Sequence, residues 1–448
     1  MKPFISLQLH QRARLFIIPD LIWVSLLAAY IIAGVRLVPF HGDESTQIYM
    51  SRDYDYQFRQ NDWSLVRYSP TPISPTEQQL RLLNGTLYKY LVGFGRHIAG
   101  IETTNEQWDW GADWNYNQSF GHAPSEDLLR IGRTTSALFL AAGVGVMFLL
   151  GRQLGGRPVA YFASLYYALH PVLLLNGRRA MQEGMMTFFA LLVVLLTIWF
   201  LKRRSWRSAV LLGVAAGLAL ASKHTNIFTV AAVFGAIGLH LLYRFFQRQP
   251  HTAILKMALQ VALIGLLTSG VFYALNPAWW GEPLERAQFV LNERRTLLNF
   301  QEGLFGGYSD FAEQIGGFAR QTFLAQPQYF EVDNWAGFIG DQIAQYEASP
   351  WRGITLAGST LGGVLLALLT LIGLWRLWQD RAIAGETRWI VGLWAVVVLA
   401  ATALLTPLEW QRYYLPAYPM IGLLAASGVV WGIQTVTAQL QALRYHPI

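Results

Sequence analysis

The feature that most constrains the fold of this chain is a series of long apolar runs separated by short basic clusters. Each run holds roughly 18 to 24 residues with almost no acid, enough for a helix to cross a hydrocarbon core of roughly 30 Å. The 448 residues are 53% hydrophobic and only 14% charged, which excludes an ordinary soluble globule. The sequence therefore predicts an all-α polytopic membrane protein.

The basic clusters predict how the chain crosses the membrane. The first run, residues 15–38, follows Lys2, Arg12 and Arg14 and precedes no small-residue cleavage site, so we expect a retained helix with a cytoplasmic N-terminus. If later basic clusters also lie in the cytoplasm, the chain between them crosses an even number of times. The resulting hairpins are residues 15–150, 159–201, 209–243, 257–375 and 389–438. About ten transmembrane helices and a cytoplasmic C-terminus follow.

Two predicted extracytoplasmic loops, residues 39–124 and 276–352, are much longer than a turn. Long loops on a rigid scaffold commonly carry function, so we expect the chemistry there, within a single integral membrane domain spanning residues 1–448. In the first loop, the apolar stretch 80–101 is interrupted by Lys89, Arg96 and His97. That pattern favours a helix lying in the membrane interface over one that spans it.

Charge and cysteine content exclude several classes of function. The net charge of +7 would suit a nucleic acid, but the basic residues are scattered between apolar runs and nucleic acid is not expected as a partner. The absence of cysteine excludes disulfides, thiolate metal sites and a cysteine nucleophile. The sequence has no nucleotide-binding glycine loop and no metal-ligand spacing, so we predict no metal site and no definite cofactor. A divalent cation stays open as an alternative, although no ligand cluster supports one.

Two adjacent carboxylates, Asp43 and Glu44, follow the first apolar run at its outer boundary. A carboxylate near an apolar boundary can gain proton affinity and act as a general base, while its neighbour orients it or binds a substrate hydroxyl. The alternative is the solvated start of a loop, because Asp-Glu pairs are common. Both interpretations remain open from the dipeptide alone.

Basic residues also occur in outer segments, where the topology rule does not expect them. They are Arg81 and Lys89 in the first loop, Arg178 and Arg179, Lys223 and His224, and Arg412. The segment before Lys223 has about 14 residues, or roughly 21 Å of helix, which is shorter than the hydrocarbon thickness and places Lys223 below the outer surface. Converging cations at that depth suit a phosphate whose lipid tail stays in the bilayer.

Two alternatives stay open for these cations. They can snorkel to lipid headgroups, or pair with Glu183 and Glu409. Glu183 stands four residues after Arg179, and we expect a helical ion pair between them. Tyr413 and Tyr414 are candidates for substrate contact, as is Glu183, but tyrosines at this depth are also common interfacial anchors.

Four of these motifs together resemble known families. They are the first helix ending in Gly42-Asp43-Glu44, the stretch from Arg81 to Tyr90, the turn from Gly217 to Thr225, and the stretch from Arg412 to Pro419. The chain from about residue 15 to 420 resembles the protein O-mannosyltransferase and aminoarabinose transferase families, which are phospholipid-carrier-dependent glycosyltransferases of the GT-C fold. With about ten spans, it has fewer than many members.

The resemblance implies a reaction and a place for it. Asp43 would be the general base, with Glu44 as its neighbour, and the donor would be a sugar on a polyprenyl phosphate. Lys223, His224, Arg178 and Arg412, with Lys89 and Arg81, would bind the donor phosphate.

The acceptor hydroxyl would belong to a protein, a lipid or an envelope glycan, and configuration at the sugar would invert. The lack of soluble modules favours a prokaryotic inner membrane, with an extracytoplasmic active site. The alternative function is a membrane transporter or flippase of an anionic lipid-linked substrate.

Overall fold

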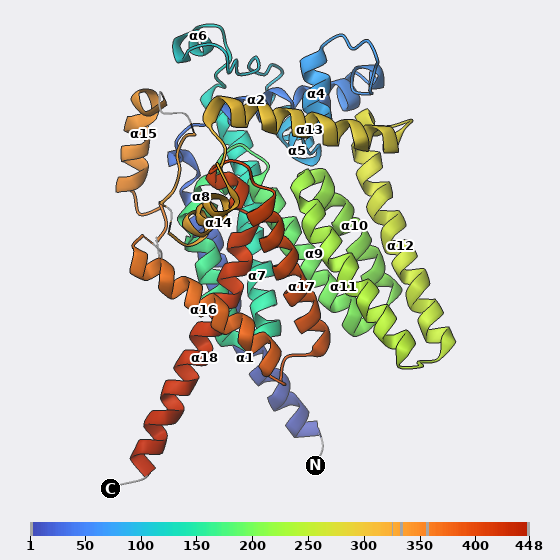
Figure 1. Ribbon diagram of the computed structural model, residues 1–448, viewed down its shortest axis with the longest axis vertical. Coiled ribbons are helices and arrows are strands. Elements are labelled where there is room, and N and C mark those ends of the chain that lie inside the picture. Colours follow the sequence, from blue (N-terminus) through green and yellow to red (C-terminus); the bar gives the residue numbers. More distant parts are fainter. Residues whose placement is uncertain (1–2, 325, 332–334, 355–357, 446–448) are drawn as a thin grey trace.

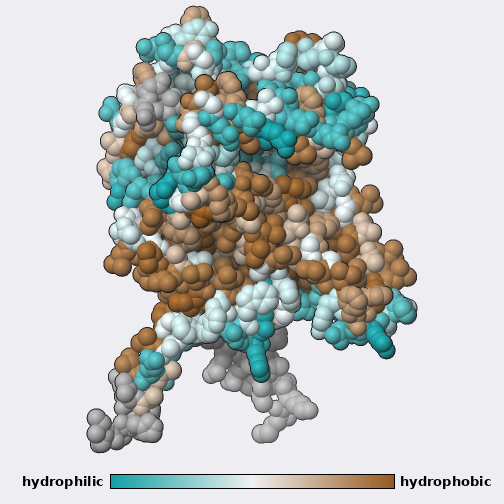
Figure 2. Space-filling model, viewed as in Figure 1, coloured by the Kyte–Doolittle hydropathy of each residue, from teal (hydrophilic) through white to brown (hydrophobic). Residues whose placement is uncertain are grey.

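The computed structural model describes residues 3–324, 326–331, 335–354 and 358–445, and its regular elements in these ranges are all helices (Figure 1). Eight helices there are long and apolar enough to cross a membrane. They comprise α1 (Pro3–Ala33), α7 (Glu126–Leu169), α9 (Glu183–Arg203), α11 (Ile227–Phe246), α12 (His251–Leu275), α16 (Thr360–Gln379), α17 (Gly385–Leu404) and α18 (Ala417–Tyr445). On the face that Figure 2 shows, apolar residues form a band across the middle of the molecule, with hydrophilic residues above and below. The predicted all-α integral membrane fold is confirmed.

Helix α7 is a hairpin of two antiparallel arms. Its backbone leaves the helical region at Gly155 and Gly156, where Gly156 has φ of +69°, a value that L-residues with a side chain rarely adopt. A Cβ atom on Gly151 would lie 2.6 Å from the Cα atom of Ala160, and one on Gly143 would lie 2.1 Å from the hydroxyl of Tyr167, so the arms pack side by side.

The second arm of α7 is followed by α8 (Pro171–Arg178), and a shorter apolar helix, α10 (Trp206–Ser222), stands between α9 and α11. If the two arms of α7 are counted separately and α10 is added, the eight apolar helices become ten. This number is the predicted one of about ten spans. The number of crossings itself stays a prediction.

The two predicted outer loops contain helices of their own. In the first are α2 (Gly42–Tyr49), α3 (Arg52–Tyr54), α4 (Pro75–Leu83), α5 (Leu87–Ile98) and α6 (Trp114–Ser119), and in the second are α13 (Pro283–Phe305), α14 (Phe311–Ala319) and α15 (Ala336–Ala348). Figure 1 shows α2, α4, α5, α6 and α13 at the end of the bundle opposite both chain termini, with α13 lying across it. We call α2, α4, α5, α6 and α13 the capping layer, because they cover this end of the bundle.

The expectation of one continuous helix over residues 80–101 was wrong, whereas the position of this stretch in the membrane interface stays a prediction. The stretch is divided between α4 and α5, which are separated at Asn84, Gly85 and Thr86. A Cβ atom on Gly85 would lie 2.3 Å from the carbonyl oxygen of Ser222, so the chain bends where it meets the end of α10. This contact brings the first outer segment against the turn that carries Lys223.

Candidate active site

The Asp-Glu pair lies in the first turn of α2, and His41 caps this helix. The backbone N–H of Asp43 donates to Nδ1 of His41 at 3.1 Å, and the backbone N–H of His41 donates to Oε1 of Glu44 at 3.1 Å. The two bonds form a capping box with histidine in the place of the usual serine or threonine. Because successive residues of a helix point about 100° apart, Asp43 and Glu44 face different surroundings.

The side chain of Glu44 is fully buried, and both of its carboxylate oxygens accept hydrogen bonds. It accepts hydrogen bonds from Nε and Nη2 of Arg133 at 2.7 and 2.9 Å and from the backbone N–H of Ala180 at 2.8 Å. Glu44 thereby joins α2 to the first arm of α7 and to the segment after α8. These contacts are those of a structural ion pair.

The carboxylate of Asp43 is 27% exposed and forms an ion pair with Nη1 of Arg412. Arg412 lies in the short 3₁₀ helix η8 (Gln411–Tyr414) that precedes α18. Its Nε atom is 3.3 Å from Oε1 of Glu331, and Oε2 of Glu331 is 2.6 Å from Nε2 of His41. Asp43, Arg412, Glu331 and His41 therefore form one polar cluster, assembled from three distant parts of the chain.

The hydrogen bonds of His41 define its protonation state. Because Nδ1 accepts from a backbone N–H, the ring proton resides on Nε2 and is donated to Glu331. Burial lowers the pKa of His41 despite the nearby Glu331, so the neutral form prevails at neutral pH. Burial would raise the pKa of Glu331, but His41 and the charge of Arg179 outweigh it and hold that pKa below its usual range.

Lys223, which follows the last residue of α10, is paired with Glu183, the first residue of α9. The Nζ atom of Lys223 is 2.5 Å from Oε1 of Glu183, whose side chain is only 4% exposed. The expected pairing of Glu183 with Arg179 was wrong, because Arg179 donates instead to the carbonyl oxygens of Pro39 and Tyr329.

The ring of His224 lies against Trp279, with the ring centroids 5.9 Å apart. His224 begins the 3₁₀ helix η4 (His224–Asn226), directly after Lys223. Gln182 donates to the carbonyl oxygen of Gly85 at 3.1 Å and to Oε1 of Gln47 in α2 at 3.1 Å. The start of α9 is thus linked both to α2 and to the chain segment that packs on the Lys223 turn.

Arg178 is buried and its guanidinium binds main-chain oxygens. It donates to the carbonyl oxygens of Ile31, Tyr30 and Trp351 at 2.8, 2.9 and 2.5 Å, and to the hydroxyl of Tyr346 at 3.1 Å. Arg178 therefore connects α8 to α1 and to the second outer segment. Its donor groups are directed at these oxygens and not at the Asp43 cluster.

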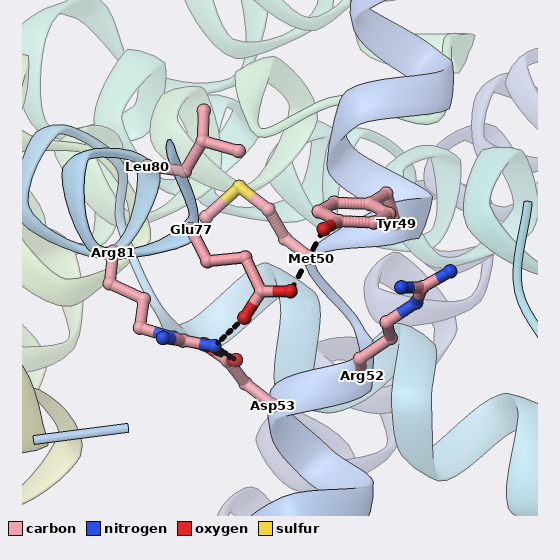
Figure 3. A pocket seen from close by; sticks show the side chains of 7 residues that line it. All are labelled: Tyr49, Met50, Arg52, Asp53, Glu77, Leu80 and Arg81. Atoms are coloured by element: carbon pink, nitrogen blue, oxygen red, sulfur yellow. Dashed lines mark hydrogen bonds and ion pairs between the residues drawn. The ribbon is translucent and has the colours of Figure 1, made fainter. Parts of the chain in front are cut away.

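Arg81 and Lys89 converge on Asp53, a residue that the sequence did not single out. Nε of Arg81 is 2.9 and 3.0 Å from the two carboxylate oxygens of Asp53, its Nη2 is 2.6 Å from Oε2 of Glu77, and Lys89 also donates to Asp53. Burial raises the pKa of Asp53, but the charges of Lys89 and Arg81 outweigh it and lower that pKa. Figure 3 shows part of this cluster lining a small pocket, where Arg81 and Tyr49 both reach the carboxylate of Glu77.

The two candidate tyrosines have different environments. Tyr413 is next to Arg412, with its ring centroid 5.7 Å from the guanidinium carbon, and its hydroxyl donates to Gln301 at 3.3 Å. Tyr414 is buried, and its hydroxyl lies 2.5 Å from that of Tyr308. Of the two, Tyr413 adjoins the Asp43 cluster. Among the residues that the structure describes, no group of three or more His, Asp or Glu side chains is arranged to hold a metal ion.

Comparisons with known proteins agree on the fold. The family of dolichyl-phosphate-mannose-protein mannosyltransferases matches residues 86–277, somewhat less than half of the chain. ArnT from Cupriavidus metallidurans, solved with undecaprenyl phosphate, superposes with a TM-score of 0.50 and 15% identity over 94% of this chain and 63% of its own. The oligosaccharyltransferase AglB from Archaeoglobus fulgidus, solved with an inhibitory peptide and a dolichol-phosphate, gives a TM-score of 0.54 and 12% identity over 95% of this chain and 52% of its own.

The chain thus spans less than two thirds of the length of either protein. A search among curated proteins found no match. The structural likenesses nevertheless extend over nearly the whole chain, and the family match falls on the segment from α5 to the end of α12. This chain is a membrane protein of the GT-C glycosyltransferase fold that resembles the dolichyl-phosphate-mannose-protein mannosyltransferases.

Proposed function

We propose that this protein transfers a sugar from a polyprenyl-phosphate-linked donor to an acceptor hydroxyl, with Asp43 as the general base and with inversion at the sugar. The observation that carries the proposal is the ion pair between Asp43 and Arg412, which joins a candidate base in the capping layer to a candidate phosphate ligand. Proteins with the same fold were solved with undecaprenyl phosphate and with a dolichol-phosphate, which supports a lipid phosphate as the donor's carrier.

In the proposed reaction, the donor phosphate competes with Asp43 for Arg412. An arginine binds phosphate through two parallel hydrogen bonds, so the incoming phosphate can take over this guanidinium. Asp43 is then released from its counterion and becomes a stronger base. Its carboxylate removes the proton of the acceptor hydroxyl, the oxygen forms a bond to the anomeric carbon, and the bond from that carbon to the phosphate oxygen breaks. The lipid phosphate leaves with the electron pair of the broken bond.

The remaining cations divide according to their partners. Lys223 is 26% exposed and has one carboxylate partner, so we assign it and the adjoining His224 to the donor phosphate together with Arg412. Arg178 binds carbonyl oxygens, and Arg81 and Lys89 bind Asp53 and Glu77, so we give these three a structural role. Glu44 supports α2, and Tyr413 lines the site beside Arg412.

The proposed location is the outer face of a prokaryotic plasma membrane, with both termini in the cytoplasm. The capping layer and the termini lie at opposite ends of the bundle, as this topology requires (Figure 1). A lipid carrier would deliver the activated sugar to this face, where nucleotide sugars are not supplied. Proteins, lipids and envelope glycans are the candidate acceptors.

The test is sugar transfer in proteoliposomes that contain the full chain, polyprenyl-phosphate sugars and crude envelope acceptors. We expect wild type to consume one donor and Asp43→Asn to lose that activity while keeping its fold. Asp127→Asn is the matched control, because Asp127 is also an acid paired with an arginine at the start of a helix, but this pair with Arg130 is about 60% exposed on both sides. Full activity of Asp43→Asn would remove Asp43 from the mechanism, and translocation of the lipid without consumption would identify a flippase instead.

A further inference from the structure

Three aromatic rings form a stack that ends at the molecular surface beside Asp43. The rings of Phe40 and Trp335 are nearly parallel, at 10° with centroids 6.2 Å apart, and those of Trp335 and Trp110 lie at 20° and 5.7 Å. Phe40 and Trp335 are 6% and 8% exposed, whereas Trp110 is 49% exposed. One face of Trp110 is covered by Trp335, so the stack is open at its Trp110 end.

The surrounding aromatic residues fix this stack in place. Trp108 and Trp114 contact Trp335 with centroids 5.4 and 5.3 Å apart, and both also contact Phe40. Phe40 lies just before α2, Trp108 and Trp110 lie before α6, Trp114 begins α6, and Trp335 directly precedes α15. A rigid aromatic surface loses little conformational entropy when it binds a partner, so it suits a ligand platform.

The open ring is next to the candidate base. A Cβ atom on Gly42 would lie 2.8 Å from Cη2 of Trp110 and 3.0 Å from Cη2 of Trp335, so both indoles rest on the backbone just before Asp43. Only glycine permits this close approach. A molecule that extended the stack at Trp110 would therefore lie beside the carboxylate of Asp43, which is 27% exposed and is bound to Arg412.

We propose that Trp110 is the binding platform for a pyranose ring of the acceptor, and hence that the acceptor is a glycan. This inference rests on the proposed function and names the acceptor class for it. A pyranose has a flat face of C–H groups that packs on an aromatic ring, while its hydroxyls project from the edge and donate to carboxylates. Asp43 and the exposed Asp109, which adjoins Trp110, provide such carboxylates.

Other acceptor types fit this surface less well. A serine or threonine side chain of a polypeptide has a hydroxyl but no ring face to extend the stack. An acyl chain has an apolar surface but no donors for Asp43 and Asp109. The combination of a flat ring and neighbouring carboxylates favours a neutral sugar, which places its hydroxyl within reach of the base.

The first test measures binding without turnover. The full chain in lipid nanodiscs is mixed with methyl glycosides of glucose, mannose and N-acetylglucosamine, or with a hexapeptide rich in Ser and Thr, and saturation-transfer NMR reports which protons touch the protein. We expect the ring protons of at least one glycoside to be saturated, with affinity falling about tenfold in Trp110→Ala and retained in Trp110→Tyr. Phe338→Ala is the matched control, because Phe338 is 44% exposed in the same aromatic region but stacks on Trp114 instead of adjoining Gly42.

The outcomes separate this inference from the proposed function. Trp110-dependent binding of a glycoside supports the platform even if no donor is consumed in proteoliposomes, in which case only the transferase proposal fails. Binding that Trp110→Ala leaves unchanged, binding of the hexapeptide alone, or no glycoside binding at millimolar concentration would each overturn the platform. Where transfer is observed, Trp110→Ala should raise KM for the acceptor about tenfold and leave KM for the donor unchanged, and the opposite split would assign the ring to the donor.

Discussion

The replacement Glu44→Gln tests whether the two adjacent carboxylates have different roles. The change keeps the size of the side chain but removes its charge. Glu44 is fully buried and accepts four hydrogen bonds, two of them from Arg133, one from the backbone of Ala180 and one from the backbone of His41. The replacement leaves the guanidinium of Arg133, itself only 8% exposed, without a counterion.

The expected cost follows from this burial. Removing one partner of a buried ion pair costs about 3 to 5 kcal/mol, because an uncompensated charge remains in a medium of low dielectric. Native proteins are stable by only about 5 to 15 kcal/mol, so Glu44→Gln should lose a large part of the stability of the protein. In the double variant Glu44→Gln/Arg133→Gln, neither charge is left alone, and we expect recovery of about 1 to 3 kcal/mol relative to the single variant.

The assay is equilibrium unfolding of the purified protein in mixed micelles, followed by circular dichroism, with donor consumption measured in parallel. Asp127→Asn is the control, because its exposed ion pair contributes about 0 to 1 kcal/mol. Glu44→Gln should be strongly destabilised, and Asp43→Asn should unfold like wild type but fail to transfer sugar. A Glu44→Gln protein with wild-type stability and no activity would refute this reasoning and make Glu44 a chemical participant.

Three further predictions follow from the site. Arg412→Ala leaves Asp43 and Glu331 without their shared cation, so KM for the donor should rise at least about tenfold in donor titrations, with Arg412→Lys between this variant and wild type. Burial lowers the pKa of His41 from about 6.5 in the unfolded chain. The neutral imidazole of His41 therefore contributes its full share to the stability of the folded state above that pH, and this contribution is lost as the pH falls toward the lower pKa of the folded state. Melting at about pH 7.5 and 5.5 should show this loss in wild type, and a smaller one in His41→Asn, whose amide oxygen can still cap α2. Gly85→Ala would place a Cβ atom 2.3 Å from the carbonyl oxygen of Ser222 and should lower both the melting temperature and donor affinity, whereas Gly340→Ala in α15, with open space around it, should not.

The sequence predicted the parts of the fold that depend on local hydrophobicity. The apolar runs predicted membrane helices, and the glycines at positions 155 and 156 lie between the basic residues Arg152 and Arg157, where a cytoplasmic turn was expected. The interfacial stretch was predicted less well, because its break depends on the contact of Gly85 with Ser222, more than 130 residues away in the sequence. A contact between residues so far apart leaves no pattern in the sequence near either of them.

The same limit explains the cations. Their convergence on one face was predicted from topology, and the structure does bring Arg412 to Asp43. The partner of each cation, however, depends on how the helices pack. Arg81 and Lys89 bind Asp53, Lys223 binds Glu183, and Arg178 binds main-chain oxygens. Glu331 reaches the site from the middle of the second outer segment, where no neighbouring motif indicated it.

The different environments of Asp43 and Glu44 follow from helix geometry. A turn of about 100° per residue means that two consecutive side chains at the start of α2 cannot both face the bundle. Glu44 faces inward, where Arg133 and the backbone of Ala180 neutralise it, and its carboxylate also completes the cap that fixes the start of the helix. Asp43 is consequently held at the edge of the capping layer, where it is partly exposed, is paired with the guanidinium of Arg412 and directly follows the glycine on which two indoles rest. An adjacent pair thus provides both a rigid support and an accessible carboxylate, which two carboxylates on the same face would not do.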